Sequence, residues 1–95
     1  MVGFGGYICD VIIQRYGTSN PAIRLLDVED GMPVAVATLN ANGLELDEVA
    51  IKDYSENKGM YETLLENGII HPKHREISTG HVTVPVCKLT EYYTL

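Results

Sequence analysis

The sequence predicts an α+β fold, with an antiparallel sheet of about five strands and one short helix packed on one face. Three observations predict this class. Runs rich in Ile, Val and Tyr, which favour strands, occupy most of the chain. Asp-Gly and Asn-Gly pairs, which are turn signals, separate several of these runs. Only residues 53–70 carry the spacing of apolar residues that is typical of a helix.

The length and composition of the chain predict a single domain over residues 1–95. A chain of 95 residues, 45% of them apolar, can build one modest core but not two. Ile, Val and Leu must fill most of that core, because the chain has one Phe and no Trp.

Three strands are predicted in the first half of the chain, at residues 7–16, 22–29 and 33–40. The segments between them are short and rich in Gly, Asn, Asp and Pro, which favour turns. Short turns join neighbouring antiparallel strands, so the three strands should form a meander. Three glycines ahead of residue 7 predict a flexible lead-in or a bulge.

A loop at 41–48 and a short strand at 49–54 lead into the helix, which we expect at residues 56–67. Ser55 or Asn57 can cap its first turn by accepting a hydrogen bond from an unpaired backbone N–H. The apolar residues of this segment recur on one side, which should face the core: Met60, Tyr61, Leu64 and Leu65.

Gly68 should end the helix in a left-handed conformation, with Ile69 making the hydrophobic contact that accompanies such an ending. Pro72 cannot donate a hydrogen bond to a sheet, so residues 69–77 are expected to be a loop or an irregular edge. The strict alternation over 81–89 predicts a last strand with one buried face.

Within that last strand, Pro85 predicts an edge position or a bulge, because proline has no backbone N–H. Residues 90–95 either extend this strand or fray.

The net charge of −6 is concentrated in the middle of the chain. Residues 27–66 hold ten acids and two lysines, a net charge of −8. Direct binding to nucleic acid needs a cationic surface, which the sequence lacks. The acidic segment is then either a solvated surface or the contact surface for a protein partner with a basic surface. The candidate contact residues, expected on the outward face of the helix, are Asp53, Glu56, Glu62 and Glu66.

Apolar runs in the chain are too short to span a membrane. The N-terminus has no cationic start and carries Asp10 within its apolar run, unlike a signal peptide. We therefore expect a cytoplasmic protein without a membrane contact, in which Cys9 and Cys87 are reduced, buried thiols.

The strongest metal-like pattern is His71-x-x-His74, with His81 and Cys87 further along the chain. Zinc sites use His and Cys at short spacings, but no Cys pair accompanies these histidines. A small-ligand or metal-binding protein, or an enzyme using His71, His74 and His81, is therefore the alternative function. The first expectation is a protein that is not an enzyme and has no cofactor.

Three segments resemble a family of small bacterial, plasmid and phage proteins of uncharacterised function. They are "VAVATLN" at 34–40, "LDEVAIKDYSENKGMYETLLENGII" at 46–70 and "STGHVTVPVCKL" at 78–89. The resemblance transfers no catalytic residue. It implies a mobile-element origin and hence a small acidic protein-binding protein, such as a phage inhibitor of a host defence system of the anti-CRISPR type.

Overall fold

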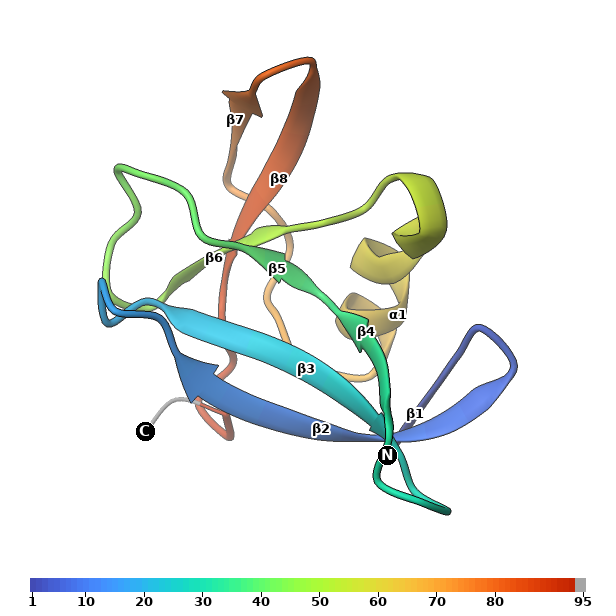
Figure 1. Ribbon diagram of the computed structural model, residues 1–95. Helices are drawn as coiled ribbons and strands as arrows, with labels where there is room; N and C mark the ends of the chain where they lie inside the picture. The colour runs from blue at the N-terminus through green and yellow to red at the C-terminus, as the bar shows by residue number, and fades with distance from the viewer. Residues whose placement is uncertain (94–95) are drawn as a thin grey trace.

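The computed structural model describes residues 1–93, which form two four-stranded antiparallel sheets and one short α-helix (Figure 1). The predicted α+β class, with antiparallel strands and one helix packed against them, is confirmed. The prediction of one sheet with about five strands was wrong in its sheet count, because the strands divide into two sheets.

The first sheet has the order β1-β2-β3-β4, so the predicted meander of three strands is confirmed and extended by β1. The glycine-rich start is not a flexible lead-in. Gly5 and Gly6 both adopt positive φ, 60° and 85°, and make a tight turn from β1 to β2. The strands are β1 (Val2–Phe4), β2 (Tyr7–Arg15), β3 (Pro21–Asp27) and β4 (Pro33–Val36).

The second sheet has the order β5-β6-β8-β7. Of the two alternatives predicted for residues 69–77, a loop or an irregular edge, the second fits the end of the segment: its last three residues begin the edge strand β7, and Pro72 precedes that strand. The loop alternative extends too far because Pro72 disrupts only its own neighbourhood. The strands are β5 (Thr38–Leu39), β6 (Glu48–Ile51), β7 (Arg75–Thr79) and β8 (Val82–Lys88).

One stretch of chain, predicted as a single strand at 33–40, joins the two sheets. β4 pairs with β3 and β5 pairs with β6, with Ala37 between them. The Ala37 N–H donates to the Ile23 carbonyl at 2.8 Å, and the Ala37 carbonyl accepts from the Lys52 N–H at 2.8 Å. The chain therefore leaves one sheet and enters the other without a turn, which alternation in the sequence cannot show.

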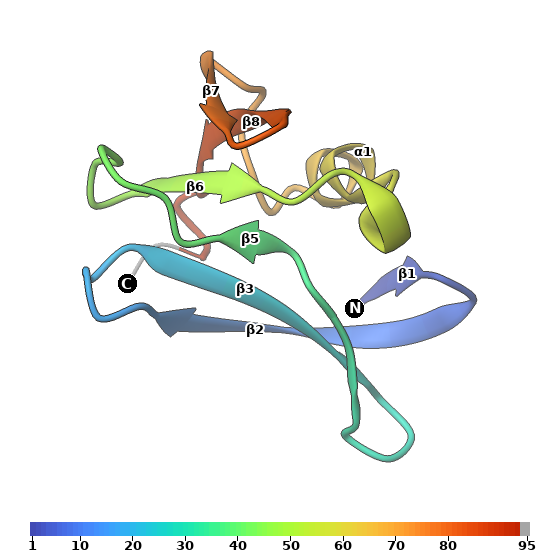
Figure 2. The same ribbon diagram turned by 45° about the horizontal axis from the view of Figure 1, so that its top comes forward.

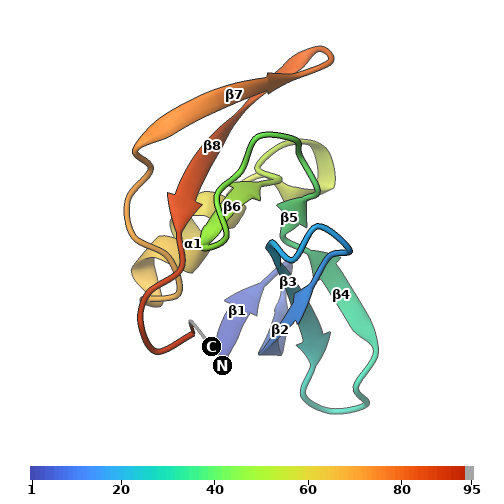
Figure 3. The same ribbon diagram turned by 90° about the vertical axis from the view of Figure 1, so that its left-hand side faces the viewer.

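β8 is central in its sheet, yet Pro85 still lies at a local edge. β6 pairs only with residues 86–88 of β8, whereas β7 pairs with residues 82–86. At Pro85 the strand has β7 as its one paired neighbour within residues 1–93. Figure 3 shows the β7–β8 hairpin extending past the end of β6.

The predicted helix at 56–67 is two shorter pieces. A 3₁₀ turn, η1 (Ser55–Asn57), precedes the helix α1 (Met60–Glu66), and Gly59 separates them at φ 94°. Neither predicted cap acts on α1. Ser55 itself has a positive φ of 55°, and the buried Asn57 side chain donates to the Val36 carbonyl at 2.7 Å.

The predicted helix ending is confirmed. Gly68 has φ 71°, its N–H donates to the Leu65 carbonyl at 3.1 Å, and the Ile69 N–H donates to the Leu64 carbonyl at 3.0 Å. This pair of bonds is a Schellman motif, which satisfies two carbonyls at the end of the helix. Ile69 is fully buried and anchors the ending to the core.

The core lies between the two sheets, with α1 beside β1 at one end (Figure 2). Aliphatic residues dominate it, as the composition predicts, and both cysteines are part of it. Its fully buried large residues include Ile23, Leu25, Ile51, Met60, Leu64, Ile69 and Ile70.

Candidate functional site

The four carboxylates predicted to contact a partner occupy different environments. Glu62 and Glu66 are exposed on α1, one turn apart, so their side chains share one side of the helix. Glu56 lies in η1 and pairs with Lys52 at 2.8 Å. The hydrogen bond from Lys52 holds the pKa of Glu56 below its ordinary value.

Asp53 does not lie on the outward face of the helix, which corrects the sequence prediction. Its Oδ1 accepts hydrogen bonds from the Gly59 N–H at 3.0 Å and from the Tyr61 N–H at 3.1 Å. These donors belong to the first turn of α1, which has no other cap from its own N-cap residue. Asp53 therefore supports the helix that carries Glu62 and Glu66.

Most carboxylates of the acidic segment have no cation beside them. Among its ten acids, three form ion pairs: Asp47, Glu48 and Glu56. Within residues 1–93 the other seven have no ion pair, so their charge faces solvent or backbone donors. They are Asp27, Glu29, Asp30, Glu45, Asp53, Glu62 and Glu66.

Glu48 is a buried carboxylate with a strongly lowered pKa, and the sequence analysis missed it by placing it in a loop. Its carboxylate is buried and accepts from Arg75 Nη2 at 2.6 Å and from His74 Nε2 at 2.5 Å. Its Oε1 also accepts from the Glu45 N–H at 2.9 Å. The Arg75 bonds chiefly, with the Glu45 and His74 bonds, outweigh burial and lower the Glu48 pKa to about 2.

A sequence signal for Glu48 did exist. Glu48 and Ala50 are two residues apart in β6, so they share one face of the strand. Ala50 is directly opposite Val86, and both side chains are fully buried. Because the apolar run "VAI" reads as a strand buried on both faces, a carboxylate that begins this strand is predicted to be buried and to need a cation.

The three histidines lie apart from one another and have different neighbours. His74 bonds to Glu48, and His71 Nε2 lies 3.5 Å from Glu91 Oε1. His81 is exposed at the turn between β7 and β8. Among the described residues, no group of three or more His, Cys, Asp or Glu side chains is placed to hold a metal ion.

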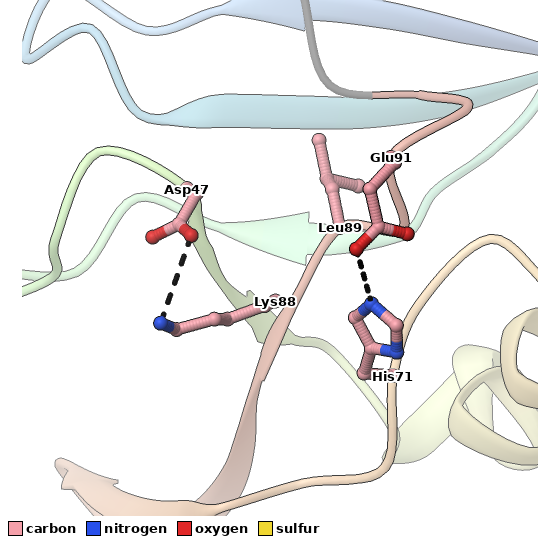
Figure 4. Close-up of a pocket in the computed structure, with 5 residues that line it drawn as sticks. All are labelled: Asp47, His71, Lys88, Leu89 and Glu91. Atoms are coloured by element: carbon pink, nitrogen blue, oxygen red, sulfur yellow. Dashed lines mark ion pairs between the residues drawn. The ribbon is translucent and has the colours of Figure 1, made fainter.

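A shallow hollow lies around His71, at the end of β8 (Figure 4). Leu89 lies between two ion pairs, His71–Glu91 on one side and Lys88–Asp47, at 3.8 Å, on the other. Each charged group that lines the hollow has its partner within the hollow. This arrangement ties the chain after β8 to its neighbours.

Cys9 and Cys87 are free, fully buried thiols, as the sequence predicts. Burial raises the pKa of Cys87 to about 12. Burial also raises the pKa of Cys9, and the neighbouring Asp27 and Asp10 charges add to this. Both thiols are therefore protonated near neutral pH and are weak nucleophiles.

Within residues 1–93, no helix has the length and apolar character needed to cross a membrane. Comparisons of the chain with protein-family models, curated proteins and solved structures found no match. The resemblance of residues 34–40, 46–70 and 78–89 to small mobile-element proteins stays a prediction.

Proposed function

We propose that this chain is a protein-binding protein whose acidic surface contacts a basic surface of another protein. One observation carries the proposal: seven of ten carboxylates between residues 27 and 66 have no ion pair within the described chain. Unpaired like charges repel one another and lower stability, while complementary charge on a partner relieves this repulsion and speeds association.

The contact surface in this proposal is the exposed side of α1, with Glu62 and Glu66 at its centre; Glu56 lies in η1, before the helix. Asp53 holds the first turn of this helix through two backbone N–H groups. The Schellman motif at Gly68 fixes its other end. A helix fixed at both ends presents its two carboxylates in a defined geometry, which lowers the entropy lost on binding.

The acidic charge also selects the class of partner. Phosphates of nucleic acid would be repelled by this surface, whereas a protein channel that binds nucleic acid is lined with Lys and Arg. Carboxylates spaced along such a channel can take the places of phosphates. Together with the resemblance to mobile-element proteins, this supports a cytoplasmic inhibitor of a host defence system, of the anti-CRISPR type, as the specific form of the proposal.

The test begins with a pull-down from the host and mass spectrometry to identify the partner, followed by surface plasmon resonance. Reversal of Glu62 and Glu66 to Lys should slow association by at least about tenfold, because steering depends on the local potential. The matched control reverses Glu76 and Glu91, which are exposed and lie outside the acidic segment. Both double variants change the net charge by the same amount.

Raising salt from about 50 to 500 mM should also slow association of the natural sequence, since the screening length falls to a few ångströms. Equal effects of the two double reversals, together with an association rate indifferent to salt, would show that the acidic helix is only a solvated cover for the core.

A further inference from the structure

The outer face of the first sheet carries aliphatic side chains where an antiparallel sheet normally carries polar ones. Side chains alternate along each strand, so those next to core residues Val11 and Leu25 point outward. The register places Ile12 opposite Arg24, and Arg24 opposite Val36, on this outer face. The aliphatic members of the face, which we call the outer β-face, are Ile8, Ile12, Leu26, Val28 and Val36.

No described element covers the outer β-face. Figure 2 shows the second sheet and α1 on the other side of β2 and β3. The exposed fractions of the side chains are 55% for Ile8, 39% for Val28 and 44% for Val36. Ile8 and Val28 are neighbours across the strands, since the Val28 N–H donates to the Ile8 carbonyl at 3.1 Å. Exposed apolar side chains gathered in this way, with polar groups among them, mark an interaction surface.

Two opposite charges lie within the outer β-face. Asp10 is directly opposite Leu26, and Arg24 is directly opposite Ile12. Within residues 1–93 neither Asp10 nor Arg24 takes part in an ion pair or a side-chain hydrogen bond. The centre of the face therefore has one unpaired anion and one unpaired cation, while Asp27 and Glu29 lie at its rim, in a hollow that they share with Ile8 and Val28.

We propose that the outer β-face binds a second copy of this chain, as a two-fold symmetric dimer with Asp10 of each copy facing Arg24 of the other. A two-fold axis brings the same surface of both copies together, so the surface must be complementary to itself. One carboxylate and one guanidinium on an apolar face meet this condition. Within the described chain, Glu62 and Glu66 on α1 have no such cation among them, so the outer β-face differs in its charge pattern from the acidic surface of the proposed function.

The area of the outer β-face limits the affinity of one copy for the other. Strands β2, β3 and β4, of nine, seven and four residues and about 4.8 Å apart, span roughly 330 Å² of flat area. Stable interfaces bury about 800 Å² of accessible surface on each partner, so the area of this one is less than half of that. The dimer should therefore exchange with the monomer and depend on protein concentration. Because α1 lies on the far side of the first sheet, the dimer leaves both acidic helix surfaces open.

Sedimentation velocity of the purified chain, from about 5 to about 500 µM, tests the proposal. The expected result is a reversible rise from the monomer to the dimer sedimentation coefficient. Asp10→Arg and Arg24→Asp should each weaken dimerisation at least about tenfold, because each places like charges in contact. The double variant Asp10→Arg/Arg24→Asp should restore it, since the opposite charges face each other again. Matched control reversals at exposed residues that are not part of the outer β-face, Glu62→Arg and Lys58→Asp, should leave it unchanged.

A second comparison does not depend on charge. Ile8→Thr should weaken the dimer, whereas Leu46→Thr, at an exposed leucine in the loop before β6, should not. Melting curves of all variants check that each is folded. The proposal is overturned by a natural sequence that stays monomeric up to about 500 µM. It is also overturned if the double reversal fails to restore a dimer that both single reversals weaken.

Discussion

At the scale of single residues, three carboxylates of the acidic segment have three different structural roles. Glu48 is buried, forms an ion pair with Arg75 and shares a hydrogen bond with His74; Asp53 accepts from backbone N–H groups, and Glu62 is exposed. The net charge of the segment does not distinguish these three carboxylates. Burial decides between them, because a buried carboxylate must be paired while an exposed one is stable in water.

Glu48 gives a prediction about acid stability. Its folded pKa of about 2 is below its ordinary value of 4.5, so the folded state favours the ionised form. The stabilisation is complete above about pH 4.5 and is lost as the pH falls toward 2. Glu48→Gln should therefore lower the free energy of unfolding by roughly 2–3 kcal/mol at pH 7, allowing for screening at half-exposed Arg75.

Urea melts of both proteins between pH 7 and pH 2 measure this difference, which should shrink through the window from about 4.5 to 2. Glu45→Gln is the matched control, since Glu45 is exposed and its side chain forms no ion pair within residues 1–93. A constant difference at every pH would mean that the Glu48 charge is not what stabilises the fold.

At the scale of elements, the sequence predicted the end of the helix well and its beginning poorly. The ending depends on Gly68 and Ile69, which act through local backbone geometry. The beginning depends on Asp53, which reaches its partners six and eight residues ahead across a 3₁₀ turn and Gly59. Capping rules assume a residue adjacent to the helix, so they selected Ser55 and Asn57.

The apolar side of α1 gives a second prediction. Leu64 is fully buried in the core, while Glu62 is exposed on the opposite side. Leu64→Ala should lower the free energy of unfolding by about 2–4 kcal/mol, because it leaves a cavity. Glu62→Ala should change it by no more than about 0.5 kcal/mol. Urea melts of the two variants measure this, and equal sensitivity would place Glu62 rather than Leu64 against the core.

The strands were predicted from the sequence more accurately than their assembly into sheets. The strand at 7–16 and the last strand at 81–89 both match the structure closely. The division into two sheets depends on Ala37, whose N–H and carbonyl bond to different sheets. Alternation identifies which side of a strand is buried, but it does not identify the neighbouring strand. Alternation likewise does not identify ion pairs between residues that are distant in the sequence, such as Glu48 and Arg75.

At the scale of the whole molecule, the two sheets should unfold together, as the prediction of a single domain over 1–95 requires. They share one core, and the stretch 33–39 belongs to both. The buried Thr38 hydroxyl strengthens this link. It accepts a hydrogen bond from the Ile23 N–H at 3.2 Å and lies 2.9 Å from the Tyr16 hydroxyl.

Thr38→Val tests this link, because Val keeps the shape and removes the hydroxyl. The Ile23 N–H then loses an acceptor in a buried place, so the free energy of unfolding should fall by about 1–3 kcal/mol. Hydrogen exchange by NMR should show the same decrease for the slowest amides of β3 and of β8, since both exchange through global unfolding. Thr83→Val, at an exposed position in β8, is the control and should change neither. A decrease confined to one sheet would mean that the two sheets open separately and that the chain is not one cooperative domain.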